Sequence, residues 1–261
     1  MWFRHFAIWY RKEYILKAFI NAILDCIFPP HCPVCGKVVS FQDGRICFSC
    51  RAVLKYVQEP RCMKCGKSIT GEEKEYCWDC SKKEFSYIRG FSVWEYDENM
   101  RKSIAAFKYH QRAEYRFYYG EQIEERFGDK LRSLRLDALI PVPLHRRKLN
   151  IRGYNQAELI AKQVSQDLHV PVCSKLLVRT KYTRPQKELD DTARWKNLKT
   201  AFSIRKKEAE RLRGKGIFPE RVLLVDDIYT TGSTMEACTR TLMQAGVKEV
   251  YLLSLSIGRG K

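Results

Sequence analysis

From Phe91 onward, apolar runs and amphipathic stretches alternate along the chain. The apolar runs have the length and composition of buried strands, and they cover residues 91–96, 137–143, 174–180, 221–227 and 249–257. The stretches with the 3.6-residue apolar spacing of a helix cover residues 100–109, 113–134, 153–168, 194–200 and 233–245. Such alternation predicts an α/β domain with a mostly parallel sheet and flanking helices over residues 89–261.

The first 28 residues differ in character. They are dense in aromatic side chains, and their apolar spacing suits an amphipathic helix that Pro29 and Pro30 would end. Such a helix packs on its own protein, or lies on a partner or a membrane surface. Lys17 interrupts the apolar run, and no secretory cleavage site follows. We therefore expect a cytoplasmic protein without a membrane span, with peripheral membrane contact through residues 1–28 as the alternative.

Residues 29–88 contain a cysteine repeat. Eight of the 11 cysteines form four CxxC pairs, whose first members recur every 15 residues. Two such pairs supply the four thiolates of a structural zinc site, so the repeat predicts a double zinc ribbon. Glycine follows only the first and third pairs, which favours consecutive over crossed pairing. The expected ligand sets are Cys32, Cys35, Cys47 and Cys50 for one zinc, and Cys62, Cys65, Cys77 and Cys80 for the other. Disulfides or a redox CxxC are the alternatives, and both suit cytosolic thiols less well.

The chain is strongly basic, with a formal net charge of +18. Residues 142–215 carry 19 Lys and Arg against 7 Asp and Glu, a net charge of +12. This excess predicts an anionic partner, which is nucleic acid, a phosphate-bearing ligand or an anionic membrane surface. An ordinary solvated basic face is the alternative.

Residues 222–234 read VLLVDDIYTTGST. The apolar strand ends in Asp226 and Asp227, at the edge where open α/β sheets bind ligands. The following turn offers hydroxyls, a glycine and the amides of a helix start, which suit a phosphate, while carboxylates suit a sugar diol or a divalent metal. Ribose 5-phosphate carries both a phosphate and a sugar diol. A Walker B strand needs a GxxxxGK[ST] loop and a dinucleotide site needs GxGxxG, and the sequence has neither. A helix start beside solvated aspartates is the plain structural alternative.

This run resembles the 5-phosphoribosyl-1-pyrophosphate (PRPP) signature of type I phosphoribosyltransferases. The resemblance implies that Asp226 and Asp227 face the ribose hydroxyls and that Mg²⁺ accompanies the ligand. It implies that the 5′-phosphate is held by Thr230, Thr231, Gly232, Ser233 and Thr234. The segment FKYHQR (107–112) is similar to the pyrophosphate loop of these enzymes, with Lys108 as the anion contact. Asp226, Asp227 and Lys108 are then the candidate catalytic residues.

Two further segments, PVPLHRRKLNIRGYNQAELIA (141–161) and TRPQKELDDTARWKNLKTAF (183–202), accompany these motifs. With the double zinc ribbon and the PRPP signature, they resemble the ComFC members of the ComF family of competence proteins, over residues 26–258. The resemblance implies natural transformation and the handling of single-stranded DNA that enters the cytoplasm, together with the DNA-uptake machinery or a helicase. Cations in these segments suit the phosphates of a single strand, and the candidates are Arg146, Arg147, Lys148, Arg152, Arg184 and Lys187.

Two functional hypotheses follow from the sequence. In the first, the protein is a DNA-uptake factor that binds single-stranded DNA and retains a ribose 5-phosphate pocket. In the second, it is an active phosphoribosyltransferase that acts on a nucleobase or a related acceptor. The expected organisation is an amphipathic helix at 1–28, a double zinc ribbon at 29–88 and a phosphoribosyltransferase-like domain at 89–261.

Overall fold

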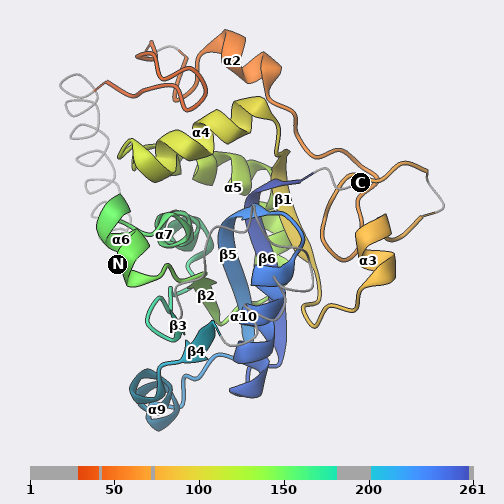
Figure 1. Ribbon diagram of the computed structural model, residues 1–261, viewed down its shortest axis with the longest axis vertical. Coiled ribbons are helices and arrows are strands. Elements are labelled where there is room, and N and C mark those ends of the chain that lie inside the picture. The colour runs from red at the N-terminus through yellow and green to blue at the C-terminus, as the bar shows by residue number, and fades with distance from the viewer. Residues whose placement is uncertain (1–28, 41–42, 72–73, 181–200, 259–261) are drawn as a thin grey trace, which may run out of the picture. The chain divides into compact units, whose positions relative to one another are not determined.

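The computed structural model describes residues 29–40, 43–71, 74–180 and 201–258. The helices predicted at 1–28 and 194–200 lie outside these ranges. The chain, drawn in Figure 1, divides into two compact units, Met1–Ala52 and Val53–Lys261.

Each unit contains one four-cysteine cluster with the same local backbone structure. In the first unit, the Cys32 N–H donates to the Lys37 carbonyl at 2.8 Å and a short bridge joins His31 to Val38. In the second, the Cys62 N–H donates to the Lys67 carbonyl at 2.8 Å. A short helix follows the third cysteine of each cluster, α2 (Phe48–Val53) in one case and α3 (Trp78–Lys82) in the other. The sequence repeat is therefore also a structural repeat.

The second unit is built on a four-stranded parallel sheet with the order β1-β6-β5-β2. Its strands are β1 (Gly90–Glu95), β2 (Ala138–Pro141), β5 (Arg221–Tyr229) and β6 (Glu249–Ile257). The predicted parallel α/β sheet is confirmed. β5 runs two residues past its predicted end, because its last residues remain paired with β6 up to Tyr229 opposite Ile257. Asp226 and Asp227 therefore lie within the strand, close to its carboxyl end.

Helices connect these strands, and most lie close to where the apolar spacing predicts them. The described ones in this part of the chain are α4 (Glu98–Tyr109), α5 (Tyr115–Ser133), α6 (Arg146–Arg152), α7 (Gln156–Leu168), α9 (Lys206–Gly214) and α10 (Ser233–Gln244). Asp97 begins α4 by accepting a hydrogen bond from the Met100 N–H at 3.0 Å. An antiparallel pair, β3 (Leu177–Arg179) and β4 (Phe202–Ile204), stands apart from the main sheet.

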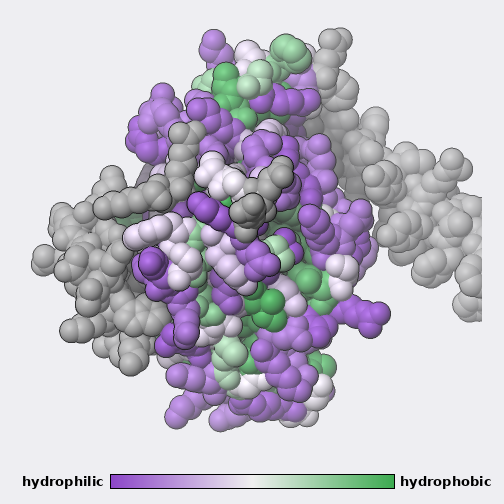
Figure 2. Space-filling view, turned by 90° about the vertical axis from the view of Figure 1, so that its right-hand side faces the viewer, coloured by the Kyte–Doolittle hydropathy of each residue, from purple (hydrophilic) through white to green (hydrophobic). Residues whose placement is uncertain are grey.

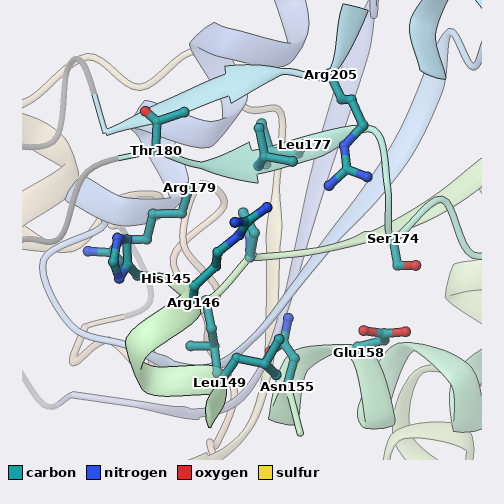
Figure 3. A pocket seen from close by; sticks show the side chains of 13 residues that line it. His145, Arg146, Leu149, Asn155, Glu158, Ser174, Leu177, Arg179, Thr180 and Arg205 are labelled. Atoms are coloured by element: carbon teal, nitrogen blue, oxygen red, sulfur yellow. The ribbon is translucent and has the colours of Figure 1, made fainter. Parts of the chain in front are cut away.

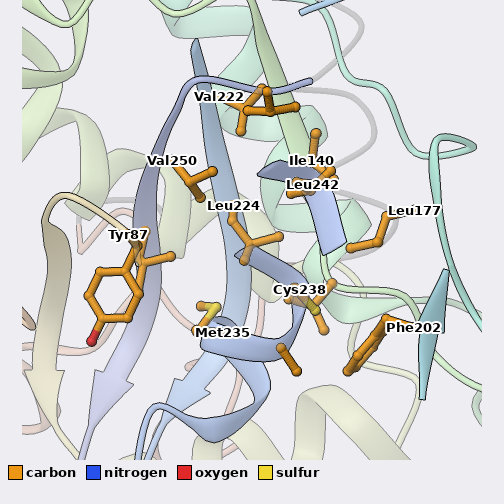
Figure 4. Close-up of a cluster of buried hydrophobic side chains, with 14 of the residues drawn as sticks. Tyr87, Ile140, Leu177, Phe202, Val222, Leu224, Met235, Cys238, Leu242 and Val250 are labelled. Carbon is orange, nitrogen blue, oxygen red and sulfur yellow. The ribbon is translucent and has the colours of Figure 1, made fainter. Parts of the chain in front are cut away.

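The two faces of the sheet carry different layers. α5 and α7 contact β1, β2 and β5, whereas α10 contacts β4, β5 and β6. The core on the α10 side takes alternate residues of the strands, such as Val222, Leu224 and Val250, together with Met235 and Cys238 (Figure 4). This alternation is what a strand buried on both faces requires. Three cysteines of the second cluster, Cys62, Cys65 and Cys77, belong to the same core.

The outer surface is mostly hydrophilic, in contrast to the apolar core. Hydrophilic residues cover most of the face seen in Figure 2, with hydrophobic residues scattered between them. Among the described residues, no helix combines the length and the apolar content that crossing a membrane requires.

Candidate functional site

The loop after β5 has a conformation that depends on glycine. Gly232 adopts a left-handed conformation with φ of 79° and immediately precedes α10. A Cβ atom at this position would overlap the Tyr229 hydroxyl and would lie 3.0 Å from Cε1 of Phe85. The hydroxyls of Thr231 and Ser233 are 2.9 Å apart at the start of the helix. Residues 229–233, called the phosphate loop below, thus join hydroxyl groups to a helix N-terminus, an arrangement that favours anions.

The two aspartates stand beside this loop, and Asp227 faces a lysine from another segment. The Lys108 ammonium lies 2.6 Å from Oδ2 of Asp227, and both side chains are largely buried. Lys108 comes from the last turn of α4, so the fold brings together residues more than a hundred positions apart. Burial, and then the neighbouring charge of Asp227, raise the pKa of Asp226 to about 7. The sequence-predicted pair Lys108 and Asp227 is therefore in direct contact.

Further cations from two other segments surround this pair. Burial, followed by repulsion from Arg179, Arg152 and Lys108, lowers the pKa of Lys148. Burial also lowers the pKa of Arg179, while the nearby carboxylate of Asp226 acts in the opposite direction. Cations from α4, α6 and β3 therefore share one electrostatic environment with the two aspartates.

The basic helix α6 is held close to α4 by specific contacts. One Arg152 nitrogen donates to the Tyr109 hydroxyl at 3.0 Å, and the other donates to Oε1 of Gln156 at 2.9 Å. The Tyr154 hydroxyl donates to the Phe107 carbonyl, and its ring is half-buried against α4. Arg152 and Tyr154 thus fix α6 beside the end of α4 that carries Lys108.

A cavity of about 700 Å³ opens between α6, α7 and β3 (Figure 3). Its cationic lining is Arg146, Arg179 and Arg205, and Glu158 contributes one carboxylate. Apolar walls come from Leu149, Leu177 and neighbouring residues. In the described part of the chain, no carboxylate pairs with Arg146 or Arg205, whereas Glu158 pairs with Lys162 at 2.8 Å. A basic cavity with apolar walls suits a phosphate attached to a ring.

The structure brings together only part of the predicted nucleic-acid surface. Arg146 lines the cavity, Lys148 lies within the electrostatic reach of Asp227, and Arg152 contacts Tyr109 and Gln156. Arg147 is exposed, and its N–H donates to Nδ1 of His145 at 3.3 Å. Arg184 and Lys187 lie outside the described residues. Arg205 was not singled out as a binding residue from the sequence, because it is separated from α6 by more than fifty residues and becomes its neighbour only through β3 and β4.

The eight cysteines form two clusters in the consecutive arrangement. In each cluster the sulfur atoms lie within 4.8 Å of one another. Individual separations are 3.6 Å for Cys32 and Cys47, 3.8 Å for Cys35 and Cys47, and 3.7 Å for Cys65 and Cys77. A tetrahedral zinc with Zn–S bonds of about 2.3 Å separates its sulfurs by about 3.8 Å. The clusters are therefore consistent with two zinc sites, each closed by four thiolates and thus structural in role.

Comparison with known proteins finds similarity to a zinc-ribbon family and to competence proteins. Residues 23–81 match the family model of the double zinc ribbon domain. Over 121 residues the chain is 40% identical to competence protein F of Haemophilus influenzae, which covers 46% of this chain and 50% of that protein. Over 163 residues it is 27% identical to competence protein ComFC of Bacillus subtilis, which covers 59% and 58%. The chain is therefore similar to competence proteins of the ComF type over these parts of its length.

The chain is also similar to DNA utilization proteins. The DNA utilization protein YhgH of Escherichia coli K12 is 33% identical over 119 residues, or 46% of this chain and 48% of that protein. The chain spans about half the length of the curated relatives it matches. Among solved structures, it is similar to a purine phosphoribosyltransferase from Pyrococcus horikoshii, with a TM-score of 0.32, 16% identity, and coverage of 55% of this chain and 86% of that one. Structural likeness at that level carries no argument about activity.

Proposed function

We propose that the carboxyl edge of the sheet is a ribose 5-phosphate pocket, and that the protein uses it while handling incoming single-stranded DNA in natural transformation. The contact between Lys108 and Asp227 beside the phosphate loop carries this proposal. It puts a cation, a pair of carboxylates and a helix N-terminus together at the edge of a parallel sheet, where ligands of open α/β folds bind.

Each group has a role that its chemistry supports. The loop hydroxyls and the first amides of α10 donate to the 5′-phosphate. Asp226 and Asp227 accept hydrogen bonds from the ribose hydroxyls, and Lys108 is within reach of an anion on the anomeric carbon. Carboxylate oxygens are the ligands that Mg²⁺ prefers, so the same two aspartates would hold it. Bound there, Mg²⁺ would supply charge neutralisation for a pyrophosphate group.

The strand-binding part of the proposal rests on the cavity and on the helix beside it. Arg146 and Arg205 line the cavity together with apolar side chains. A phosphate backbone binds such guanidinium groups, and bases bind the apolar walls. Arg179 lines this cavity and also interacts electrostatically with Asp226. A single strand of DNA bound in the cavity would therefore approach the ribose 5-phosphate pocket.

Calorimetric titration of PRPP into the full chain tests the pocket. The Asp226→Ala, Asp227→Ala double variant should lose PRPP and ribose 5-phosphate binding while retaining its zinc content. Asp129→Ala is the matched control, because this carboxylate is fully exposed on α5 and pairs only with Arg132 among the described residues. Unchanged PRPP binding in the double variant would rule out the pocket.

Fluorescence anisotropy with a labelled single strand tests the DNA role. Affinity should fall with salt, with a logarithmic slope of about −0.7 for each phosphate contacted. Arg146→Ala with Arg205→Ala should flatten this slope, whereas Arg211→Ala should not, because that exposed side chain is paired with Glu208. Absent or salt-insensitive binding would refute the role. Transformation assays of a deletion strain complemented with the same variants, scored separately for DNA uptake and for recombinants, extend the test to the cell.

An active phosphoribosyltransferase is the second candidate. The observation that favours it is the contact of Lys108 with Asp227, because a cation beside the carboxylates would stabilise a departing pyrophosphate. Release of pyrophosphate from PRPP upon addition of a nucleobase, lost in the aspartate double variant, would identify the protein as an enzyme. Tight PRPP binding without any pyrophosphate release would leave the binding role alone.

A further inference from the structure

The phosphate loop is hydrogen-bonded to the segment that leaves the second cysteine cluster. The hydroxyls of Tyr87 and Tyr229 are 2.7 Å apart, and these residues are only 0% and 5% exposed. Tyr87 follows the last cysteine of the cluster by seven residues, and Tyr229 is the first residue of the loop. A buried hydroxyl that loses its partner is costly, so this bond holds the two segments together.

An aromatic layer reinforces the same contact. The Phe85 and Tyr87 rings stack with centroids 5.1 Å apart. Gly232 packs against this layer so closely that a Cβ would lie 2.9 Å from Cζ of Tyr229 and 3.0 Å from Phe85. The left-handed turn of the loop therefore rests on side chains from the segment 85–87.

A carboxylate fixes the helix that follows the loop. Glu236, in the first turn of α10, is fully buried and accepts hydrogen bonds from the N–H and the hydroxyl of Ser86, each at 2.7 Å. Arg240 donates to the same carboxylate at 2.6 Å. The N-terminus of α10 is thus fixed to the residue between Phe85 and Tyr87.

The other side of this segment is joined to the cysteine cluster. The Gly90 N–H donates to the Lys64 carbonyl at 2.7 Å, and the Lys64 ammonium lies 5.3 Å from the centroid of the Tyr87 ring. The backbone of Gly90 packs directly on the backbone of the cluster, because a Cβ on Gly90 would lie 2.8 Å from the Cys65 carbonyl oxygen. Tyr87 and Tyr229 share one core with Cys65 and Cys77. Figure 4 labels Tyr87 within this core.

We propose that Tyr87 and Glu236 are positioning residues, through which the second four-cysteine cluster holds the phosphate loop in its anion-binding shape. The folding of that cluster then sets the affinity of the loop for a 5′-phosphate. The proposal concerns the second cluster alone, and the first cluster lies in the other unit, Met1–Ala52. The inference rests on the proposed ribose 5-phosphate pocket, but its structural half is independent of any ligand.

Hydrogen–deuterium exchange of the ligand-free full chain tests that structural half. Tyr87→Phe and Tyr229→Phe should each speed exchange in residues 229–236 by roughly fivefold, the effect of one buried hydrogen bond. The double variant should be no worse than either single variant, because both remove the same bond. Tyr251→Phe is the matched control, since it removes a tyrosine hydrogen bond to Glu249 elsewhere in the sheet. Additive effects of the two substitutions, or an equal effect of the control, would overturn the proposal.

PRPP titration then tests the functional half. Tyr87→Phe should weaken PRPP binding by roughly fivefold. Glu236→Ala should weaken it further, and Glu236→Gln should recover part of the loss, because the amide oxygen still accepts from Ser86. Cys80→Ser should weaken binding and Cys50→Ser, the equivalent change in the first cluster, should not. Equal effects of the two cysteine variants would refute the proposal. Failure of the wild type to bind PRPP would refute the pocket instead, and the exchange data would still decide the coupling.

Discussion

Replacing Gly232 by alanine separates two physical costs that the phosphate loop combines. The first is the left-handed backbone, with φ of 79°, which costs an L-residue about 1–2 kcal/mol. The second is contact, because the new methyl group would overlap the Tyr229 hydroxyl. Tyr229 is buried and bonded to Tyr87, so it cannot move aside without losing that bond, at a cost of about 1 kcal/mol or more.

Gly216 supplies the control for this experiment. It has a similar backbone conformation, with φ of 66°, but no atom lies within 4 Å of the position of its Cβ. Gly216→Ala should therefore pay only the backbone cost. The difference between the two variants isolates the contact, and we expect about 2 kcal/mol, or a Tm lower by roughly 4–8 °C for a domain of this size.

Calorimetric and urea unfolding of both variants measure this difference directly. Gly232→Ala should also abolish PRPP binding, whereas Gly216→Ala should preserve it, because Gly216 lies after α9 and outside the loop. A Gly232→Ala protein as stable as Gly216→Ala would show that Tyr229 yields freely. The close packing of the loop on Tyr229 and Phe85 would then have no energetic meaning.

Three further predictions concern other parts of the molecule. Lys108→Met should weaken PRPP binding at least about tenfold and destabilise the fold, because Asp227 loses its partner at 2.6 Å. Lys102→Met, an exposed change on the same helix, should do neither. Equal titration curves for the two variants would contradict this prediction. Elemental analysis of the purified protein should give two zinc ions per chain, and a folded protein without zinc would disprove both sites. Burial, and then the charge of Glu124, raise the pKa of Asp167. Asp167 therefore stabilises the folded protein most at pH values below its pKa in the unfolded chain, and this stabilisation is lost as the pH rises through its pKa in the folded protein. Asp167→Asn should flatten the dependence of the free energy of unfolding on pH in that range. An unchanged profile would contradict this prediction.

Helices and strands with a strong pattern of buried positions could be predicted from the sequence. β5 and β6 are continuous apolar runs because both faces of the sheet are covered, and the cysteine period directly reflects a repeated turn. Helix α6 was not predicted, because none of its residues is buried and its sequence therefore has no apolar period. It forms through its caps instead, with the His145 side chain at one end and left-handed Gly153 at the other.

The candidate site could be predicted only in part from the sequence. Asp226, Asp227 and the loop are contiguous in sequence, so their chemistry could be interpreted together. Ser86 and Glu236 are 150 residues apart, and their contact depends on how the chain is wound around the sheet. No local pattern reports a buried glutamate whose partners are a backbone N–H and a serine from a distant segment. For the same reason Arg205 could not be assigned to a cavity with Arg146.

The strand order has a consequence for how the protein is made on the ribosome. β6 is synthesised after the other three strands of its sheet, yet it lies between β1 and β5 and pairs with both. A nascent chain that has already emerged through β5 therefore has its first strand without the neighbour it needs. During that interval the edge of β1 and the apolar side chains around the second cysteine cluster are open to association with other chains. Because β6 joins β1 to β5, synthesis that stalls before residue 249 should yield an aggregation-prone product. Every residue of the proposed ribose 5-phosphate pocket would already have been made at that point.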